Sequence, residues 1–245
     1  MNRLSERLVC IAQMVRPGEV LADVGCDHGY LPIFLVREGR VRRAIAMDIG
    51  EGPLMRAREH IAQERLGDYI EARLSDGLEA LSPGEADAAV IAGMGGSLMV
   101  RILSRGSAVV RRLGQLILEP QSELAGVRAY LRSENYRVES EDFVLEDGKY
   151  YPILRVLPQE SSDIADFSRE SGLSAELLDA YGHRLLASRH PVLGSFLERE
   201  RHQCETILEE LSRGNVQAER TAVRKEELLR QLERNRAAAV YMHRD

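Results

Sequence analysis

The most constraining feature of this sequence is the regular alternation of short apolar runs with helix-forming segments through its first 157 residues. Proline near the start of two of these segments, at Pro32 and Pro53, is typical of the first turn of a helix, where its missing N–H costs no hydrogen bond. Strands that alternate with helices favour a parallel sheet covered by helices on both faces, so the fold class is α/β. The apolar runs predict five strands, over residues 19–23, 43–48, 69–74, 86–92 and 115–119.

The end of this region has a different pattern. Residues 136–146 and 149–157 are both rich in β-forming residues, and they flank Asp147-Gly148, a dipeptide that strongly favours a tight hairpin turn. An antiparallel hairpin that completes a parallel sheet defines one variant of the doubly wound fold. Its best-known users are class I methyltransferases, whose Rossmann-like sheet binds S-adenosylmethionine.

The last third of the sequence carries no strand pattern. Residues 158–165 are polar and include one proline, which predicts a linker. Apolar residues then recur at helical spacing over residues 196–211 and 223–232, on either side of a turn at Arg213-Gly214-Asn215. This pattern predicts two helices that form an antiparallel, coiled-coil-like hairpin.

These patterns divide the chain into two parts. We expect a methyltransferase-like domain over residues 1–160 and a helical domain over residues 161–245. A helical hairpin with alternating charges on its exposed face is more often a packing or oligomerisation element than a binding surface.

The composition limits the class of protein. The net charge of −6 gives no general attraction to nucleic acid, although only Lys149 and Lys225 among the 33 basic residues are lysine, and arginine suits phosphate best. The longest apolar run, residues 88–100, is too short to cross a bilayer. The three cysteines lie far apart, and the six histidines show no metal-binding spacing. We therefore expect a cytoplasmic protein with no membrane segment and no metal, with a monomer favoured.

The loop after the first predicted strand, Asp23-Val-Gly-Cys-Asp-His-Gly29, carries the most chemistry. A dinucleotide-binding loop has the spacing Gly-x-Gly-x-x-Gly, in which the middle glycine admits a pyrophosphate. Counted from Gly25, the middle position is Asp27 and the last is Tyr30, so this fingerprint is absent. A carboxylate at that place repels a pyrophosphate but suits a ligand with an ammonium and a sulfonium group, as S-adenosylmethionine has. The alternative is an ordinary turn without a ligand.

Acidic residues and glycines also follow the next three predicted strands. Asp48, with Ile49 beside it, ends the second strand, where doubly wound folds place an acid against ribose hydroxyls. Asp76-Gly77 follows the third strand, and its carboxylate is a candidate acceptor for an adenine amino group. Ala92-Gly-Met-Gly95 follows the fourth strand, beside the expected reactive end of the ligand. An acid after a strand is often only a helix cap, but ligands of open α/β sheets bind at the carboxyl ends of strands, where all of these features lie.

A series of longer motifs runs through the chain. They are Leu4-Ser-x-Arg7-Leu8, Asp23-Val-Gly-Cys-Asp-His-Gly-Tyr-Leu-Pro32, Gly52-Pro53, Asp76-Gly77-Leu78, Ile91-Ala-Gly-Met-Gly-Gly96, Leu116-Ile-Leu-Glu-Pro120-Gln121 and Glu146-Asp-Gly-Lys-Tyr150. In this order, and over nearly the whole chain, the sequence resembles the bacterial tRNA (adenine-22-N1)-methyltransferases, the TrmK family.

The resemblance implies an enzyme that uses S-adenosylmethionine to methylate N1 of adenine 22 in tRNA and that carries a C-terminal helical extension. We place Asp27, His28 and Tyr30 at the mouth of the catalytic site, with Asp27 orienting the donor and His28 or Tyr30 contacting the base; a hydrogen-bonded turn is the alternative role for His28. The expected donor-binding residues are Asp23, Gly25, Cys26, Asp27, Asp48, Ile49, Asp76, Gly77, Ala92, Gly93, Met94 and Gly95. The expected substrate-binding residues are Arg7, Glu119, Pro120 and Gln121.

The sequence also departs from the family pattern. Cys26 and Gly29 stand where Ser and Ala are usual, Asp48 stands in place of Glu, and Glu119-Pro-Gln121 stands in place of Gln-Pro-Asn. The last change alters the charge near the expected adenine site, so another RNA, a protein or a small molecule stays open as the methyl acceptor. A relative that binds RNA without catalysis is a further alternative, and the retained acids argue against it.

Overall fold

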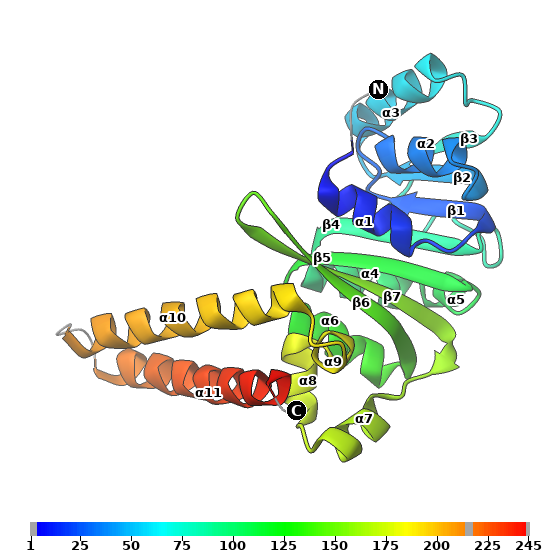
Figure 1. The fold of residues 1–245 in the computed structure, drawn as a ribbon. Coiled ribbons are helices and arrows are strands. Elements are labelled where there is room, and N and C mark those ends of the chain that lie inside the picture. The colour runs from blue at the N-terminus through cyan, green and yellow to red at the C-terminus, as the bar shows by residue number, and fades with distance from the viewer. Residues whose placement is uncertain (1–3, 214–217, 244–245) are drawn as a thin grey trace.

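A single mixed sheet forms the body of the molecule (Figure 1). The computed structural model describes residues 4–213 and 218–243, and in that part of the chain seven strands lie in the order β3-β2-β1-β4-β5-β7-β6. The strands β1 to β5 pair in parallel, whereas β7 is antiparallel to both β5 and β6. The predicted class I methyltransferase fold is therefore confirmed. The strands are Gly18–Val24 (β1), Val41–Asp48 (β2), Ile70–Leu74 (β3), Ala88–Gly95 (β4), Gln115–Ser122 (β5), Tyr136–Glu146 (β6) and Lys149–Ser161 (β7).

Helices cover both faces of the sheet, as the alternation of strands and helices predicts. One face is covered by α1 (Glu6–Met14), α2 (Tyr30–Arg37) and α3 (Glu51–Gln63). The other is covered by α4 (Gly96–Arg105), α5 (Ser107–Val110) and α6 (Leu124–Ser133). The sequence patterns had predicted α2 and α3 but not α1.

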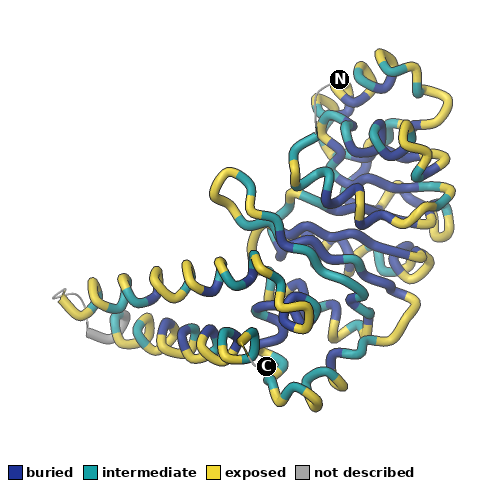
Figure 2. Tube along the Cα trace, in the orientation of Figure 1, coloured by how far each residue is buried: buried dark blue, intermediate teal, exposed yellow. Residues whose placement is uncertain are grey.

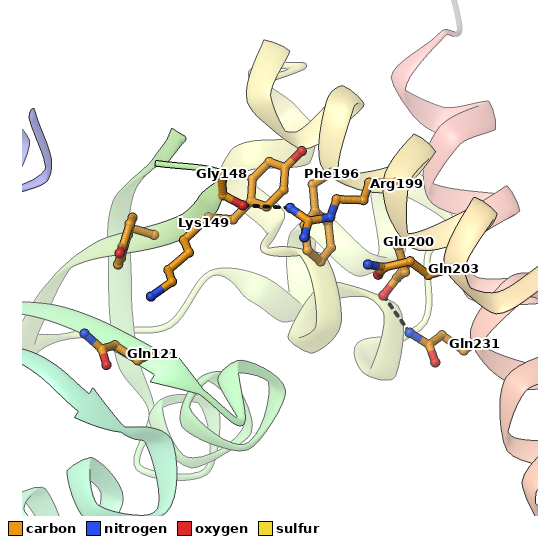
Figure 3. A pocket seen from close by; sticks show the side chains of 10 residues that line it. Gln121, Gly148, Lys149, Phe196, Arg199, Glu200, Gln203 and Gln231 are labelled. Atoms are coloured by element: carbon orange, nitrogen blue, oxygen red, sulfur yellow. Dashed lines mark hydrogen bonds between the residues drawn. The ribbon is translucent and has the colours of Figure 1, made fainter. Parts of the chain in front are cut away.

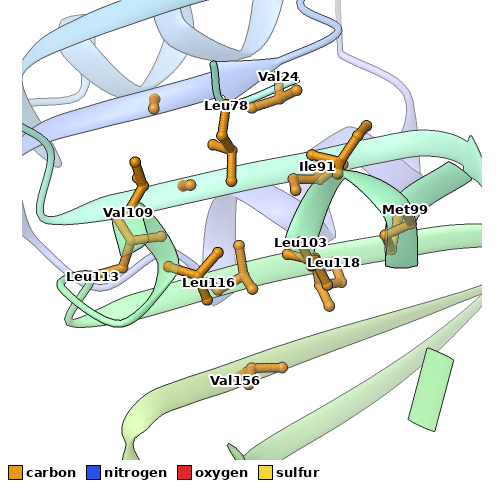
Figure 4. Close-up of a cluster of buried hydrophobic side chains, with 14 of the residues drawn as sticks. Val24, Leu78, Ile91, Met99, Leu103, Val109, Leu113, Leu116, Leu118 and Val156 are labelled. Carbon is orange, nitrogen blue, oxygen red and sulfur yellow. The ribbon is translucent and has the colours of Figure 1, made fainter. Parts of the chain in front are cut away.

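Two apolar cores result from the alternation of side chains along the central strands. In β2, Ile45 and Met47 belong to one core, while Ala44 and Ala46 belong to the other. Figure 4 shows the first core, where side chains of β4 and β5 meet those of α4 and α5. Leu103 is completely buried there, and truncating such a leucine to alanine typically costs about 2–5 kcal/mol. The sheet edge that bears the predicted site is therefore fixed from both sides.

The hairpin of β6 and β7 turns at the predicted dipeptide. Asp147 and Gly148 both have positive φ, 49° and 73°, as a two-residue hairpin turn of the primed type requires. The predicted linker over residues 158–165 is wrong. Residues 158–161 continue β7, because the pairing shifts register between Arg137 and Tyr136, and a bulge of this kind accommodates Pro158 within the strand.

The rest of the chain is helical. Three short helices, α7 (Ile164–Ser171), α8 (Ala175–Tyr181) and α9 (His183–Ala187), pack beside β6. Two long helices, α10 (Pro191–Arg213) and α11 (Ala218–Met242), then run side by side away from the sheet, with buried positions between them and exposed outer faces (Figures 1 and 2).

This long helix pair confirms the predicted helical hairpin. Gly214 and Asn215 of the predicted turn lie outside the described residues. The assignment of domains at residues 160 and 161 stays a prediction. None of the described helices is both long enough and apolar enough to cross a membrane.

A buried ion pair joins the sheet to the C-terminal helices. The guanidinium of Arg128 (α6) donates to Glu141 (β6) at 2.7 Å, and the two side chains are only 3% and 1% exposed. Arg128 also donates to the backbone carbonyls of Asp179 and Ala180 in α8. Because a buried charge without its partner is costly, this contact fixes how the helices meet the sheet.

Candidate active site

The predicted site residues come together at the carboxyl ends of β1, β2, β3, β4 and β5, here called the carboxyl edge. The backbone N–H of Gly25 donates to the carbonyl of Met47 at the end of β2, and that of Ser75 donates to the carbonyl of Asp48. On the other side, the N–H of Gly93 donates to the carboxylate of Glu119 at 2.7 Å. An unbroken series of contacts therefore links the ends of neighbouring strands, as the parallel topology requires.

Asp23 lies inside this edge, on β1, and is only 5% exposed. Burial, together with the charge of nearby Asp48, raises the pKa of the Asp23 carboxyl to about 7 from its ordinary value of 3.8. Two carboxylates that repel each other at a buried position are stabilised when a cation binds between them. The site therefore has a built-in preference for a positively charged ligand.

The end of β2 offers a carboxylate and an apolar side chain next to each other. Asp48 is half-buried, and its Oδ1 accepts a hydrogen bond from the N–H of Gly50 at 2.8 Å, which orients the carboxylate at the start of α3. Ile49 is 70% exposed, although isoleucine is usually buried. An exposed apolar side chain beside a fixed carboxylate is what a flat ring attached to a sugar would contact.

The loop after β1 lies directly against the carboxyl end of β4, which extends through the predicted loop residues 92–95. Gly25 has a φ of +77°, and a Cβ atom at this position would lie 2.5 Å from Cε of Met94. Only glycine combines this backbone conformation with such a close approach. The two glycine-containing loops predicted from the sequence, residues 23–29 and 92–95, are thus in contact.

The mouth of the site carries a stack of three rings. His28 stacks on Tyr30 at a centroid distance of 5.2 Å, and His60 of α3 stacks on both. The ring Nδ1 of His60 lies 2.9 Å from the backbone carbonyl of His28, which holds the stack in place. Asp27, with a side chain that is 59% exposed, pairs with Arg56 of α3 at 2.8 Å.

The substrate-side prediction covers two different places. The carboxylate of Glu119 is completely buried and accepts hydrogen bonds from the guanidinium of Arg7 and the N–H of Gly93, each at 2.7 Å. Burial raises the pKa of this carboxyl, although Arg7 and the N–H of Gly93 partly oppose the rise. The guanidinium of Arg7 also lies over the ring of Tyr151, 5.2 Å from its centroid. Pro120 is buried in β5, and Gln121, which follows it, is exposed at the surface.

The carboxylate of Asp76, which follows β3 at the carboxyl edge, is already paired with a cation. Asp76 pairs with Arg105 of α4 at 3.1 Å, and Arg105 also pairs with Glu79. The carbonyl of Gly77 accepts from the hydroxyl of Ser75 at 2.8 Å, which fixes the turn of this loop, while the N–H of Ser75 holds it against the end of β2. In the described ranges 4–213 and 218–243, no group of three or more His, Cys, Asp or Glu side chains is arranged to hold a metal ion.

Comparisons with known proteins agree with this arrangement. Residues 4–154 match the family described as "Methyltransferase domain". The tRNA (adenine(22)-N(1))-methyltransferase of Bacillus subtilis is 35% identical to this chain over 210 residues, which cover 86% of each sequence. The crystal structure of the B. subtilis m1A22 tRNA methyltransferase TrmK superimposes with a TM-score of 0.86 at 31% identity, and covers 97% of this chain and 99% of that one.

The chain belongs to the TrmK family. The resemblance drawn from its motifs is therefore confirmed. A second TrmK-like structure, Streptococcus pneumoniae Sp1610 in complex with S-adenosyl-L-methionine, has a TM-score of 0.82 at 30% identity and covers 97% of this chain and all of its own (100%). Both structures extend over the C-terminal helices as well as the sheet.

Three side chains at the site were missed by the sequence interpretation: Arg56 and His60 of α3, and Tyr151 of β7. Arg56 and His60 are four residues apart and so share one face of their helix, which is a signal that the sequence contained. Tyr151 contacts Arg7 only because β7 pairs with β5 inside the sheet, and no local sequence pattern predicts such a long-range contact. The candidate site of this chain is therefore assembled partly from segments outside the strand ends.

Proposed function

We propose that this chain transfers the methyl group of S-adenosylmethionine to N1 of adenine 22 in tRNA. The observation that carries the proposal is the 35% identity to the B. subtilis tRNA (adenine(22)-N(1))-methyltransferase over 86% of both sequences. The structure of Sp1610 with S-adenosyl-L-methionine supports the choice of donor. The carboxyl edge supports it independently, because the buried Asp23 and the neighbouring half-buried Asp48 favour a cationic ligand.

The residues at the ends of β1 and β2 fit the donor. The carboxylate of Asp23 accepts from the ammonium group, and that of Asp48 accepts from ribose hydroxyls. Ile49 provides an apolar surface for the adenine ring, and the loop around Gly25 allows the ligand to approach the backbone. Asp76 completes the donor site: its carboxylate pairs with Arg105 and at the same time accepts a hydrogen bond from the adenine amino group of the donor.

The methyl transfer does not require the protein to supply a strong general base. The donor supplies an electrophilic methyl group, and N1 of adenine carries a free lone pair at neutral pH. The protein must chiefly hold donor and acceptor in line at near-attack distance. Methylation leaves a positive ring, which the exposed carboxylate of Asp27 stabilises, while the stacked rings of His28 and Tyr30 contact the base.

Glu119 has a positioning role in this scheme. Its buried carboxylate joins Arg7 to the N–H of Gly93, and so fixes the loop after β4 that faces the reacting atoms. The pair also holds the N-terminal helix α1 against the carboxyl edge. The target adenine must leave the folded core of the tRNA to reach this loop.

A transfer assay with labelled donor tests the proposal. Purified protein is incubated with methyl-tritiated S-adenosylmethionine and two tRNA transcripts that differ only by adenine or guanine at position 22. We expect label in the adenine transcript and background in the guanine transcript. Equal label in the two transcripts would reject position 22, and no label in either, with donor binding intact by calorimetry, would indicate another methyl acceptor or a relative without catalysis.

A further inference from the structure

A groove lies beside the carboxyl edge, between the tip of the β6–β7 hairpin and the long helices (Figure 3). It has a volume of about 540 Å³, which is in the range of ligand-binding pockets. We call it the hairpin groove and define it by Gln121 of β5, Lys149 and Tyr150 of the hairpin, Arg199 and Gln203 of α10, and Gln231 of α11. Four parts of the chain that are separate in sequence therefore build one site.

The groove begins where the catalytic site ends. Gln121 directly follows Glu119 and Pro120 at the end of β5, and it lines the groove with an exposed side chain. Tyr151, which contacts Arg7 of the Glu119 network, lines it as well. A polymer whose one residue enters the catalytic site can thus place a neighbouring residue in the groove.

The groove presents unpaired positive charge. Lys149 is exposed and forms no ion pair with any described residue, and in Figure 3 its ammonium group points into the open space between the hairpin and Gln121. The guanidinium of Arg199 donates to the carbonyl of Gly148 at 2.8 Å and lies over the ring of Tyr150, contacts that fix its position without neutralising its charge.

The acid in the groove is already bound. Glu200 accepts from Gln231 at 2.8 Å through one oxygen, and from the hydroxyl of Tyr181 at 2.6 Å and the amide of Asn235 at 2.9 Å through the other. These three neutral donors fix the carboxylate on the helix side without cancelling its charge, so Lys149, Arg199 and Glu200 together leave one net positive charge in the groove. Two cations face the opening, and the ligand they suit is an anion.

Amide side chains accompany the two cations. The side-chain amides of Gln121 and Gln203 line the groove and form no hydrogen bond with other residues in the described part of the chain. An amide offers both a donor and an acceptor, which is what the edge of a nucleobase requires. Cations for a phosphate and free amides for a base edge point to a nucleotide.

We propose that the hairpin groove holds a tRNA nucleotide next to the methylated adenine, with Lys149 and Arg199 on its phosphate and the amides of Gln121 and Gln203 on its base. This inference rests on the proposed function and adds a second subsite to it. The flanking nucleotide, once held, keeps the extruded adenine at the catalytic mouth. Methylation at full rate therefore needs the groove for binding, not for the chemical step.

The first test compares two single-charge variants. Lys149→Ala removes a groove cation, and Arg42→Ala removes an exposed cation at the opposite, amino end of β2, where its contact with Glu19 is weak at 3.4 Å. We expect Lys149→Ala to weaken binding of the adenine-22 transcript about tenfold, as for one lost charge-assisted hydrogen bond, and to lower the slope of log affinity against log salt by about 0.7. Arg42→Ala should change neither and should keep the wild-type kcat, and both variants should keep wild-type donor affinity.

A matched pair on α10 gives a second test. Arg199→Ala should weaken tRNA binding, whereas Arg201→Ala, two residues along the same helix and facing a different pocket, should not. Because Arg199 also bonds the hairpin, the Tm of each variant is measured alongside. Equal tRNA affinity for Lys149→Ala, Arg199→Ala and the two controls would overturn the proposal.

A thermodynamic cycle that combines Lys149→Ala with a neutral backbone linkage in the tRNA identifies the phosphate that Lys149 contacts. Transcripts are ligated with one neutral methylphosphonate linkage at each position within about two nucleotides of adenine 22, and each is bound to the wild type and to Lys149→Ala. We expect the cost of Lys149→Ala to vanish at one of these linkages. If the cost persists at all of them, the groove does not hold a neighbour of the target. A wild type that methylates no tRNA would instead reject the proposed function itself, so the two failures are distinguishable.

Discussion

The carboxyl edge and the hairpin groove are adjacent, yet they carry opposite charges. The edge gathers Asp23, Asp27 and Asp48, with Asp23 buried so deeply that its pKa rises. The groove presents Lys149 and Arg199, and its one acid is held by three donors. A cationic methyl donor and a polyanionic RNA need opposite surroundings, and this fold provides both by placing one at the strand ends and the other between a hairpin and two helices.

The largest effect should come from breaking the junction between the sheet and the C-terminal helices. Arg128→Ala leaves Glu141 buried without its partner, so we expect a loss of about 3–5 kcal/mol in the free energy of unfolding. Arg169→Ala, which breaks an exposed ion pair with Asp166 on α7, is the control and should cost about 1 kcal/mol or less. Urea denaturation measures both. Equal losses would mean that the buried pair does not hold the helices against the sheet.

The next largest effect should be a loss of affinity for the methyl donor without a loss of affinity for tRNA. Asp23→Asn keeps the shape of the side chain and removes the charge that the donor's ammonium needs. We expect donor affinity to fall about 100-fold, within the range for a hydrogen bond to a charged group, while tRNA affinity stays at the wild-type value. Calorimetry with S-adenosylmethionine and a tRNA-binding assay measure the two. A parallel loss of both affinities would contradict the division of labour between edge and groove.

The same carboxyl gives the donor affinity a pH dependence. The folded, ligand-free pKa of Asp23 is about 7, and a cationic ligand binds the ionised form. Below that pH binding must first displace a proton, so affinity should fall about tenfold per pH unit as pH drops below 7, and level off above it. Asp23→Asn should show no such slope. A wild-type affinity that is flat between about pH 5.5 and 8 would show that Asp23 does not contact the ligand.

The free energy of unfolding should change with pH in the opposite direction to the donor affinity. Between the ordinary pKa of 3.8 and the folded pKa of about 7, the folded state holds a proton at Asp23 that the unfolded state has released. Wild-type stability from this group therefore falls as pH rises through that window, because ionisation of the folded state is opposed. Asp23→Asn should melt above the wild type at about pH 8, with a much smaller difference at about pH 5.5. Scanning calorimetry of both proteins without ligand measures this.

The smallest effect concerns the ring stack. His28→Phe preserves a ring against Tyr30 and His60, whereas His28→Ala removes it. If His28 acts by stacking on the base, His28→Phe should keep kcat within about twofold of the wild type, and His28→Ala should lose about tenfold, a typical stacking contribution. Equal losses in the two variants would show that the imidazole nitrogens are needed instead.

The sequence predicted the carboxyl edge better than the groove for a physical reason. Asp23, Asp48 and Gly93 each lie near the carboxyl end of a strand, and parallel topology alone brings the ends of parallel strands together. The hairpin groove depends on how β6 and β7 twist toward α10, a matter of long-range packing that no local pattern reports. Lys149 could be read from the sequence as one of two lysines, but not as a neighbour of Arg199.

The errors have local causes. The linker expected at residues 158–165 was read from polar composition, whereas pairing with β6 across a bulge draws residues 158–161 into β7. The helix α1 was missed, although Ser5 caps it by accepting from the N–H of Leu8. Its arginine, Arg7, was nevertheless assigned to the site through the family motif, and the structure places it on Glu119.

Mapping the methylated nucleoside tests the central claim most directly. A transcript with adenine at position 22 is incubated with the protein and S-adenosylmethionine, digested, and sequenced by mass spectrometry. We expect 1-methyladenosine at position 22 and at no other nucleotide. Methylation of a different nucleotide, or of a different atom of that adenine, would contradict it.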